Sequence, residues 1–155
     1  MYAISAAFEV NPANEPVQLT RAQMWKGLVQ KAEYAVPFVP AMKECEVIER
    51  FEDGFIRQIS LRGKTLRERI TFTPEVQVHF QRIESADNGW ITNVLSDSER
   101  GLTLTFTFAL VFDGIAAGSE DEKPPSRLAM CTSKPPSASC AASETKTCVA
   151  HPSQR

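Results

Sequence analysis

The strongest constraint on the fold is a series of strand-length segments separated by turn signals, which begins after Lys43. The turns are marked at Asp53-Gly54, Arg62-Gly63-Lys64, Pro74, Asp87-Asn88-Gly89 and Arg100-Gly101. Between them the chain is rich in valine, isoleucine, threonine and phenylalanine, which are typical of strands. Together with a strand expected at 2–10, these segments predict an antiparallel sheet whose later strands follow one another as hairpins.

The last of these segments, 102–112, shows the alternation most clearly. Large apolar residues occupy every second position, at Leu102, Leu104, Phe106, Phe108, Leu110 and Phe112, and threonines occupy most of the positions between them. A period of two predicts a strand with one apolar face and one largely polar face. An apolar face of this size must be covered by another layer of the protein.

Residues 20–34 carry the clearest helical signature. Thr20 and Gln23 have the spacing of a capping box, and Leu19 and Met24 flank it as a hydrophobic staple. Apolar residues then follow along one helical stripe, at Trp25, Leu28, Val29 and Ala32. We predict a helix over 21–34, followed by a short second helix or turn between two prolines, Pro37 and Pro40. The expected order is therefore one strand, a helix pair and six strands.

The charge of the chain bears on its partners and its location. The 155 residues carry a formal net charge of -2, a balance that gives no basic footprint for nucleic acid and no polybasic patch for a membrane. No apolar run is long enough for a transmembrane helix, and the N-terminal residues lack the basic and apolar regions of a signal peptide. We expect a cytoplasmic protein that binds neither nucleic acid nor membrane.

The composition of the chain changes near residue 118. Residues 123–155 contain no Phe, Tyr, Trp or Gly, but five prolines, six serines and three of the four cysteines. Such a stretch cannot bury enough apolar surface to offset the entropy lost on ordering. We predict a folded domain over 1–118 and a disordered tail over 119–155.

Several blocks of the sequence resemble one known family. They are Leu19 to Leu28, Lys31-Ala32, Phe38-Val39-Pro40, Cys45-Glu46-Val47, Glu68 to Pro74 and Val76 to Phe80. Their order and spacing resemble the acetylaranotin-biosynthesis-cluster-protein-like family, a family of unknown function in the START-like, pollen-allergen-like superfamily. The resemblance implies an α+β helix-grip fold, in which a curved antiparallel sheet wraps round a long C-terminal helix and encloses a cavity.

The C-terminal sequence departs from that pattern. Residues 114–122 lead into Lys123-Pro124-Pro125, and no helical apolar stripe follows. We therefore predict that the long C-terminal helix is missing, and that this end derives from a frameshift, a retained intron or an alternative exon. The apolar face of 102–112 would then stay uncovered and would favour self-association.

Two charged residues fall on the apolar faces of neighbouring strands. Arg57 has the parity of the apolar residues in 55–61, and Glu68 has the parity of those in 66–72. A hairpin that turns near Gly63 would place the two opposite each other. Because a charge on a core face must be paired, we predict a buried ion pair. The pair either fixes the strand register, or anchors a polar group of a ligand, or supplies a carboxylate for acid–base chemistry.

These observations favour a binding module for a small hydrophobic or amphipathic molecule, with an accessory role in secondary metabolism. The candidate ligand-binding residues are Arg57, Glu68, Trp25, Phe106, Phe108 and Leu110. One alternative is a cyclase- or dehydratase-like enzyme in which Glu68 moves a proton, although no second acid, base or nucleophile lies on the same face. Another is a truncated product without activity. Trp25 could equally be plain core, and His79 should face solvent, since it shares parity with Gln77 and Gln81.

The C-terminal residues also contain a possible metal pattern. Cys131, Cys140, Cys148 and His151 provide three thiols and an imidazole, which suit tetrahedral zinc. Their spacing resembles a zinc finger only loosely, and no aromatic residue or glycine accompanies them. We therefore predict no metal site and no cofactor.

Overall fold

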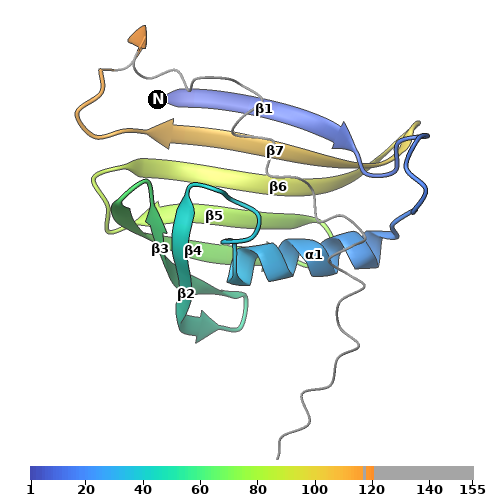
Figure 1. Cartoon of the computed structure of the whole chain (residues 1–155), viewed down its shortest axis with the longest axis horizontal. Helices are drawn as coiled ribbons and strands as arrows, with labels where there is room; N and C mark the ends of the chain where they lie inside the picture. The colour runs from blue at the N-terminus through green and yellow to red at the C-terminus, as the bar shows by residue number, and fades with distance from the viewer. Residues whose placement is uncertain (117, 121–155) are drawn as a thin grey trace, which may run out of the picture.

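The computed structural model describes residues 1–116 and 118–120. These residues form seven strands and one helix (Figure 1). In chain order they are β1 (Tyr2–Glu9), α1 (Arg21–Glu33), β2 (Met42–Phe51), β3 (Gly54–Leu61), β4 (Lys64–Thr73), β5 (Gln77–Ile83), β6 (Asn88–Ser98) and β7 (Gly101–Val111). The turn signals of the sequence therefore fall between strands, as predicted.

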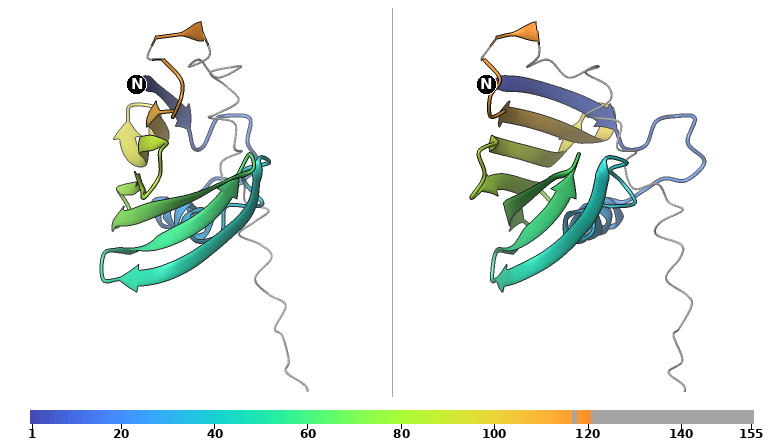
Figure 2. Two further views of the ribbon diagram at one scale, coloured as in Figure 1. Left: turned by 90° about the vertical axis from the view of Figure 1, so that its left-hand side faces the viewer. Right: turned by 60° about the vertical axis from the view of Figure 1, so that its left-hand side comes forward.

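The strands form one antiparallel sheet in the order β1-β7-β6-β5-β4-β3-β2. Strands β2 to β7 follow one another as hairpins, whereas β1 pairs with β7, the last strand in the sequence. Figure 2 shows that the sheet is curved and twisted, so that β2 and β3 run obliquely to β1 and β7. The predicted curved antiparallel sheet is confirmed.

The strand register gathers the apolar side chains on one face, which we call the inner face. One row across it consists of Ile4, Phe108, Ile91, Phe80, Ile70 and Phe55. The helix α1 packs on this face, and its buried residues Met24, Leu28 and Ala32 belong to the same core cluster as Phe80 and Phe106. The apolar stripe of the helix and the apolar parity of the strands therefore meet in one core.

The capping box at the start of α1 forms as the sequence indicates. The Thr20 hydroxyl accepts a hydrogen bond from the Gln23 backbone N–H at 3.2 Å, and the Gln23 side-chain oxygen accepts one from the Thr20 backbone N–H at 2.8 Å. Arg21 then joins this end of the helix to the sheet, because it donates to the Glu75 carbonyl oxygen at 2.7 Å and pairs with Asp97 at 2.9 Å.

The segment between α1 and β2 forms turns rather than the second helix of the predicted pair. The Val39 N–H donates to the Ala35 carbonyl oxygen at 3.0 Å, and the Met42 N–H donates to the Val39 carbonyl oxygen at 2.9 Å. Pro37 and Pro40 have no N–H to continue a helical ladder. The predicted helix pair is therefore wrong for the described residues, in which one helix lies between β1 and β2.

The apolar face of β7 is covered in part by α1. Leu104 and Phe106 are 1% and 2% exposed, and both belong to the cluster that contains Met24 and Leu28. This part of the face is thus not open, contrary to the expectation of an uncovered sheet. The predicted tail, apart from residues 119 and 120, lies outside the described residues, as do the predicted loss of the C-terminal helix and the cysteine pattern.

Gly89 offers a test of how closely the strands approach each other. Its φ is +119°, and a Cβ at this position would lie 2.1 Å from the Ala109 carbonyl oxygen. Gly101 has a φ of +94° but would place its Cβ in open space. The substitution Gly101→Ala should lower the free energy of unfolding by about 1–2 kcal/mol, through backbone strain alone. Gly89→Ala should lower it by clearly more, because β6 and β7 must also separate; equal losses in urea unfolding would contradict this account.

Candidate functional site

The predicted ion pair lies on the inner face, between β3 and β4. Arg57 and Glu68 are register partners, and Arg57 donates from Nε and Nη2 to Glu68 Oε2 at 2.9 and 2.7 Å. Their side chains are 6% and 3% exposed. Arg57 thus holds one carboxylate oxygen with two of its nitrogens, and the predicted buried pair is confirmed.

Arg57 also binds the C-terminal end of α1. Its third nitrogen, Nη1, donates to the Ala32 carbonyl oxygen at 2.6 Å and lies 3.4 Å from that of Lys31. The last carbonyls of a helix lack intrahelical donors and carry partial negative charge, so a buried cation stabilises them. All three guanidinium nitrogens of Arg57 therefore bind protein groups. This arrangement supports the structural interpretation of the pair, and the role of Arg57 as a ligand anchor stays a prediction.

The row of charged residues continues onto β5. Arg82 is the register partner of Glu68 and shares parity with Val78 and Phe80, both of which are buried on the inner face. Its side chain is 6% exposed. We call Arg57, Glu68 and Arg82 the charged row; it crosses three neighbouring strands in the order cation, anion, cation.

Asp87, in the turn between β5 and β6, supplies the carboxylate nearest to Arg82. Arg82 Nη1 lies 3.9 Å from Asp87 Oδ2, whereas Lys64 Nζ lies 3.3 Å from both carboxylate oxygens. The Asp113 backbone N–H also donates to Asp87 Oδ1, at 3.0 Å. Burial alone would raise the pKa of Asp87, but the Asp113 hydrogen bond and the cations Lys64 and Arg82 outweigh it and lower the pKa below its usual value.

Two side chains of the inner face carry buried polar atoms that lack a hydrogen-bond partner in the described structure. They are Arg82, through Nε and Nη1, and Asn93, through Oδ1. Asn93 lies on β6 opposite Phe106, with Val78 on its other side. Buried polar atoms are nearly always hydrogen-bonded, so both positions are candidate contacts for a ligand.

The sequence-predicted site residues do not all come together. Phe106 and Leu110 are buried on the inner face, and Phe108 is partly buried there, on the same face as the charged row. Trp25 is partly buried and packs against the core cluster that contains Phe106, but its ring lies edge to face on Phe72, with centroids 5.9 Å apart.

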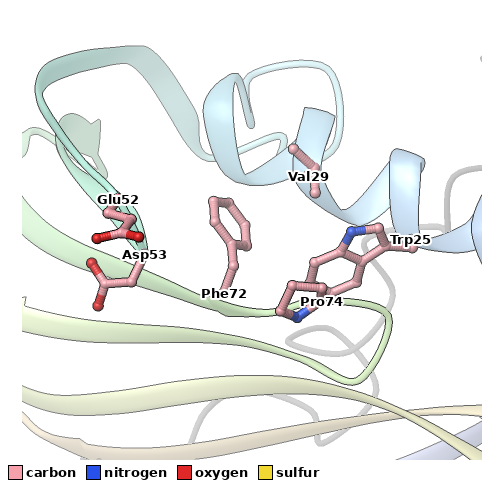
Figure 3. Close-up of a pocket in the computed structure, with 6 residues that line it drawn as sticks. All are labelled: Trp25, Val29, Glu52, Asp53, Phe72 and Pro74. Atoms are coloured by element: carbon pink, nitrogen blue, oxygen red, sulfur yellow. The ribbon is translucent and has the colours of Figure 1, made fainter.

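Trp25 instead lines a separate groove of about 480 Å³ (Figure 3). Its walls are Trp25, Val29, Glu52, Asp53, Phe72 and Pro74. Figure 3 shows the Phe72 ring between the two carboxylates on one side and Trp25 with Pro74 on the other. Asp53 pairs with Arg69 at 2.5 Å, so one of the two acids already has a cationic partner.

Sequence reasoning missed Arg82, Asp87 and Asn93. The signal for Arg82 is present, since the alternation that places His79 on the outer face continues to Arg82 on the inner one. Asp87 offers no such signal, because an Asp-Asn-Gly turn is ordinarily solvent-exposed. His79 lies on the outer face, as its parity predicts, and is partly buried there, with its ring centroid 6.1 Å from that of Trp90.

Comparison with known families identifies the chain. The family model of acetylaranotin biosynthesis cluster protein L matches residues 4–134. The chain belongs to this family. The resemblance inferred from the sequence blocks is thereby confirmed. No curated protein sequence matches the chain.

Solved structures share its fold. The di-domain aromatase/cyclase StfQ from the steffimycin biosynthetic pathway aligns with a TM-score of 0.56 and 9% identity, over 72% of this chain and 37% of StfQ. The Zhui aromatase/cyclase from Streptomyces sp. R1128 aligns with a TM-score of 0.52 and 14% identity, over 73% and 70% of the two chains. A Thermus thermophilus protein, TTHA0849, aligns with a TM-score of 0.55 and 16% identity, over 74% of this chain and 77% of TTHA0849. The curved sheet and its helix thus match the helix-grip fold of aromatase/cyclases.

The described part of the chain offers neither a membrane span nor a metal cluster. No helix within it is long and apolar enough to cross a membrane. No group of three or more histidine, cysteine or acidic side chains within it could hold a metal ion. Both statements concern residues 1–116 and 118–120 alone.

The Arg57–Glu68 pair should show strong coupling in a double-mutant cycle. Arg57→Met or Glu68→Leu alone leaves a buried charge without its partner and should cost about 3–5 kcal/mol of unfolding free energy, whereas the double substitution should cost less than the sum. The exposed pair Arg67–Glu84, at 2.6 Å, is the matched control, with coupling below about 1 kcal/mol. Additive losses at the buried pair would show that the contact does not stabilise the fold.

Asp87 should contribute stability that depends on pH. Because its folded-state pKa is lower than the ordinary 3.8, its contribution is present above that value and is lost as the pH falls through the folded-state pKa. The unfolding free energy of the native chain should therefore fall more between pH 7 and pH 3 than that of Asp87→Asn, measured by urea denaturation. Parallel pH profiles for the two proteins would contradict the lowered pKa.

Proposed function

We propose that this protein binds a small hydrophobic or amphipathic molecule on the inner face of its sheet and serves an accessory role in secondary metabolism. The observation that carries the proposal is the composition of that face. It combines a continuous apolar surface with the charged row Arg57, Glu68 and Arg82, all of them buried. Small-molecule sites typically join an apolar lining to a few polar groups that fix orientation.

The apolar part next to the charged row comes from β5, β6 and β7. Phe80, Ile91 and Phe108 are register neighbours there, and Phe108 and Ile91 are only partly buried. Phe106 and Leu110 flank Phe108 on the same face of β7. These side chains are the ones we expect to contact the apolar body of a ligand, and Ile91 and Phe108 are the two that would bury further surface on binding.

The comparisons support a role in the biosynthesis of small molecules. The family is named after the acetylaranotin biosynthesis cluster, and StfQ comes from the steffimycin pathway. Fold alone does not carry a reaction from one protein to another. The inference from these names is therefore limited to the class of ligand, a product or intermediate of secondary metabolism.

The neutral dye N-phenyl-1-naphthylamine provides the first test. The native protein should bind it saturably, with a rise in fluorescence. Phe108→Ala should weaken binding several-fold, since it removes apolar contact area on the inner face. Val111→Ala, at an exposed position on the opposite face of the same strand, should leave binding unchanged. The absence of saturable binding, or equal effects of both substitutions, would contradict the proposed function.

One observation favours an enzyme as the second candidate. Glu68 is a carboxylate buried on the inner face, in a fold shared with aromatase/cyclases. In a cyclase it would take the acidic proton of a carbon flanked by two carbonyls, and the resulting enolate carbon would attack a distant carbonyl of the same chain. The alkoxide formed there would take the proton back from Glu68. However, Oε2 of Glu68 already accepts two hydrogen bonds from Arg57. We therefore rank binding first.

Glu68→Gln separates the two functions. With a poly-β-ketoacyl thioester as substrate, an enzyme should lose turnover in this variant while dye binding is retained. A binding module should give no cyclised product above background from either the native chain or Glu68→Gln. If neither turnover nor dye binding is found, the third expectation from the sequence, a product without activity, is favoured.

A further inference from the structure

We propose that the ligand is an amphipathic anion and that Arg82 binds its charged group. This inference rests on the proposed function and names the chemistry of its ligand. The carboxylate, sulfonate or enolate of the ligand would accept hydrogen bonds from Arg82, and its apolar part would lie against Phe80, Ile91 and Phe108.

The guanidinium of Arg82 is buried with donors that lack acceptors. Arg82 is 6% exposed, and its Nε and Nη1 have no hydrogen-bond acceptor among the described residues. An arginine side chain stays protonated at any physiological pH, so it cannot escape the cost of burial by losing its charge. Two N–H donors that point into the protein interior without acceptors are costly for stability alone. Nε and Nη1 lie on different edges of the guanidinium, so an anionic oxygen would satisfy one of these donors, through the charge-assisted hydrogen bond typical of arginine.

Neither acidic neighbour of Arg82 accepts a hydrogen bond from its Nε or Nη1. Glu68, the cross-strand partner of Arg82, gives Oε2 to two nitrogens of Arg57. Asp87 accepts from Lys64 and Asp113, and its Oδ2 stays 3.9 Å from Arg82 Nη1, beyond hydrogen-bond distance. Asp87 therefore offsets part of the charge of Arg82 but does not satisfy its donors.

The strand next to β5 contributes a glycine near Arg82. Gln81, the chain neighbour of Arg82, pairs with Trp90 and donates from Nε2 to the Gly89 carbonyl oxygen at 3.0 Å, and Gly89 pairs in turn with Leu110. Beyond it lie the apolar residues of the inner face, and the Phe112 ring centroid is 6.0 Å from the guanidinium carbon of Arg82. The surroundings of Arg82 thus suit a molecule with one charged end and an apolar body.

Two related dyes test this inference. 1-Anilinonaphthalene-8-sulfonate has the ring system of N-phenyl-1-naphthylamine plus one sulfonate, so the pair differs only in the group that Arg82 would bind. Arg82→Gln should weaken binding of the sulfonate dye by about tenfold or more and leave binding of the neutral dye within about twofold. Arg100→Gln makes the same change in net charge at an exposed side chain, and it should leave the binding of both dyes unchanged.

A second pair of variants keeps the test decisive if Arg82→Gln does not fold. Arg82→Lys retains the charge and should keep more affinity for the sulfonate dye than Arg82→Gln. Asp87→Asn removes the competing carboxylate near Arg82 and should strengthen binding of the sulfonate dye, but not of the neutral one. If Arg82 had a purely structural role, Arg82→Gln would not weaken binding of the sulfonate dye while Asp87→Asn strengthens it.

The outcomes separate this inference from the proposed function. Suppose that the neutral dye binds and that Phe108→Ala weakens its binding, but that Arg82→Gln changes the affinities for the two dyes equally or changes neither. The assignment to Arg82 is then wrong and the binding function stands. If Asp87→Asn leaves the affinity for the sulfonate dye unchanged or lowers it, the assignment is also wrong. If the neutral dye does not bind saturably, the proposed function fails, and the role of Arg82 fails with it.

Discussion

The guanidinium of Arg57 holds the two layers of the structure together. Two of its nitrogens bind Glu68 on the neighbouring strand, and the third binds the Ala32 carbonyl at the end of α1. Apolar packing of α1 on the sheet is strong but permits small shifts along the surface. A buried, directional hydrogen bond at the end of the helix removes that freedom, because any displacement of α1 would leave donors of Arg57 without acceptors.

This arrangement depends on strand register. Side chains alternate between the two faces, so a slip of one residue between β3 and β4 would move either Arg57 or Glu68 to the outer face and leave the other charge buried without its partner. The same slip would move the inward-facing apolar residues of the slipped strand to the outer face. Burial of apolar side chains and pairing of charges therefore select the same register, and neither can be changed alone.

Much of this structure is predictable from the sequence because its signals are local. The capping box at Thr20, the turn glycines and the alternation along β7 each act within a few residues. The Arg57–Glu68 pair is predictable because one short hairpin fixes both residues. The second helix was mispredicted since Pro37 and Pro40 permit either a turn or a short helix. Asp87 was missed because its partners, Lys64 and Asp113, lie 23 and 26 residues away and meet it only in the folded sheet.

The position of α1 also determines which arginine of the charged row remains available. Arg57 and Arg82 flank Glu68 symmetrically on adjacent strands, and either could pair with it. Only Arg57 also reaches the carbonyl end of α1, so one guanidinium there satisfies both the helix end and the carboxylate. Glu68 Oε2 is thereby bound to Arg57, and Nε and Nη1 of Arg82 stay without an acceptor among the described residues. The packing of a single helix thus turns a symmetric row of charges into a structural ion pair on one side and a candidate anion site on the other.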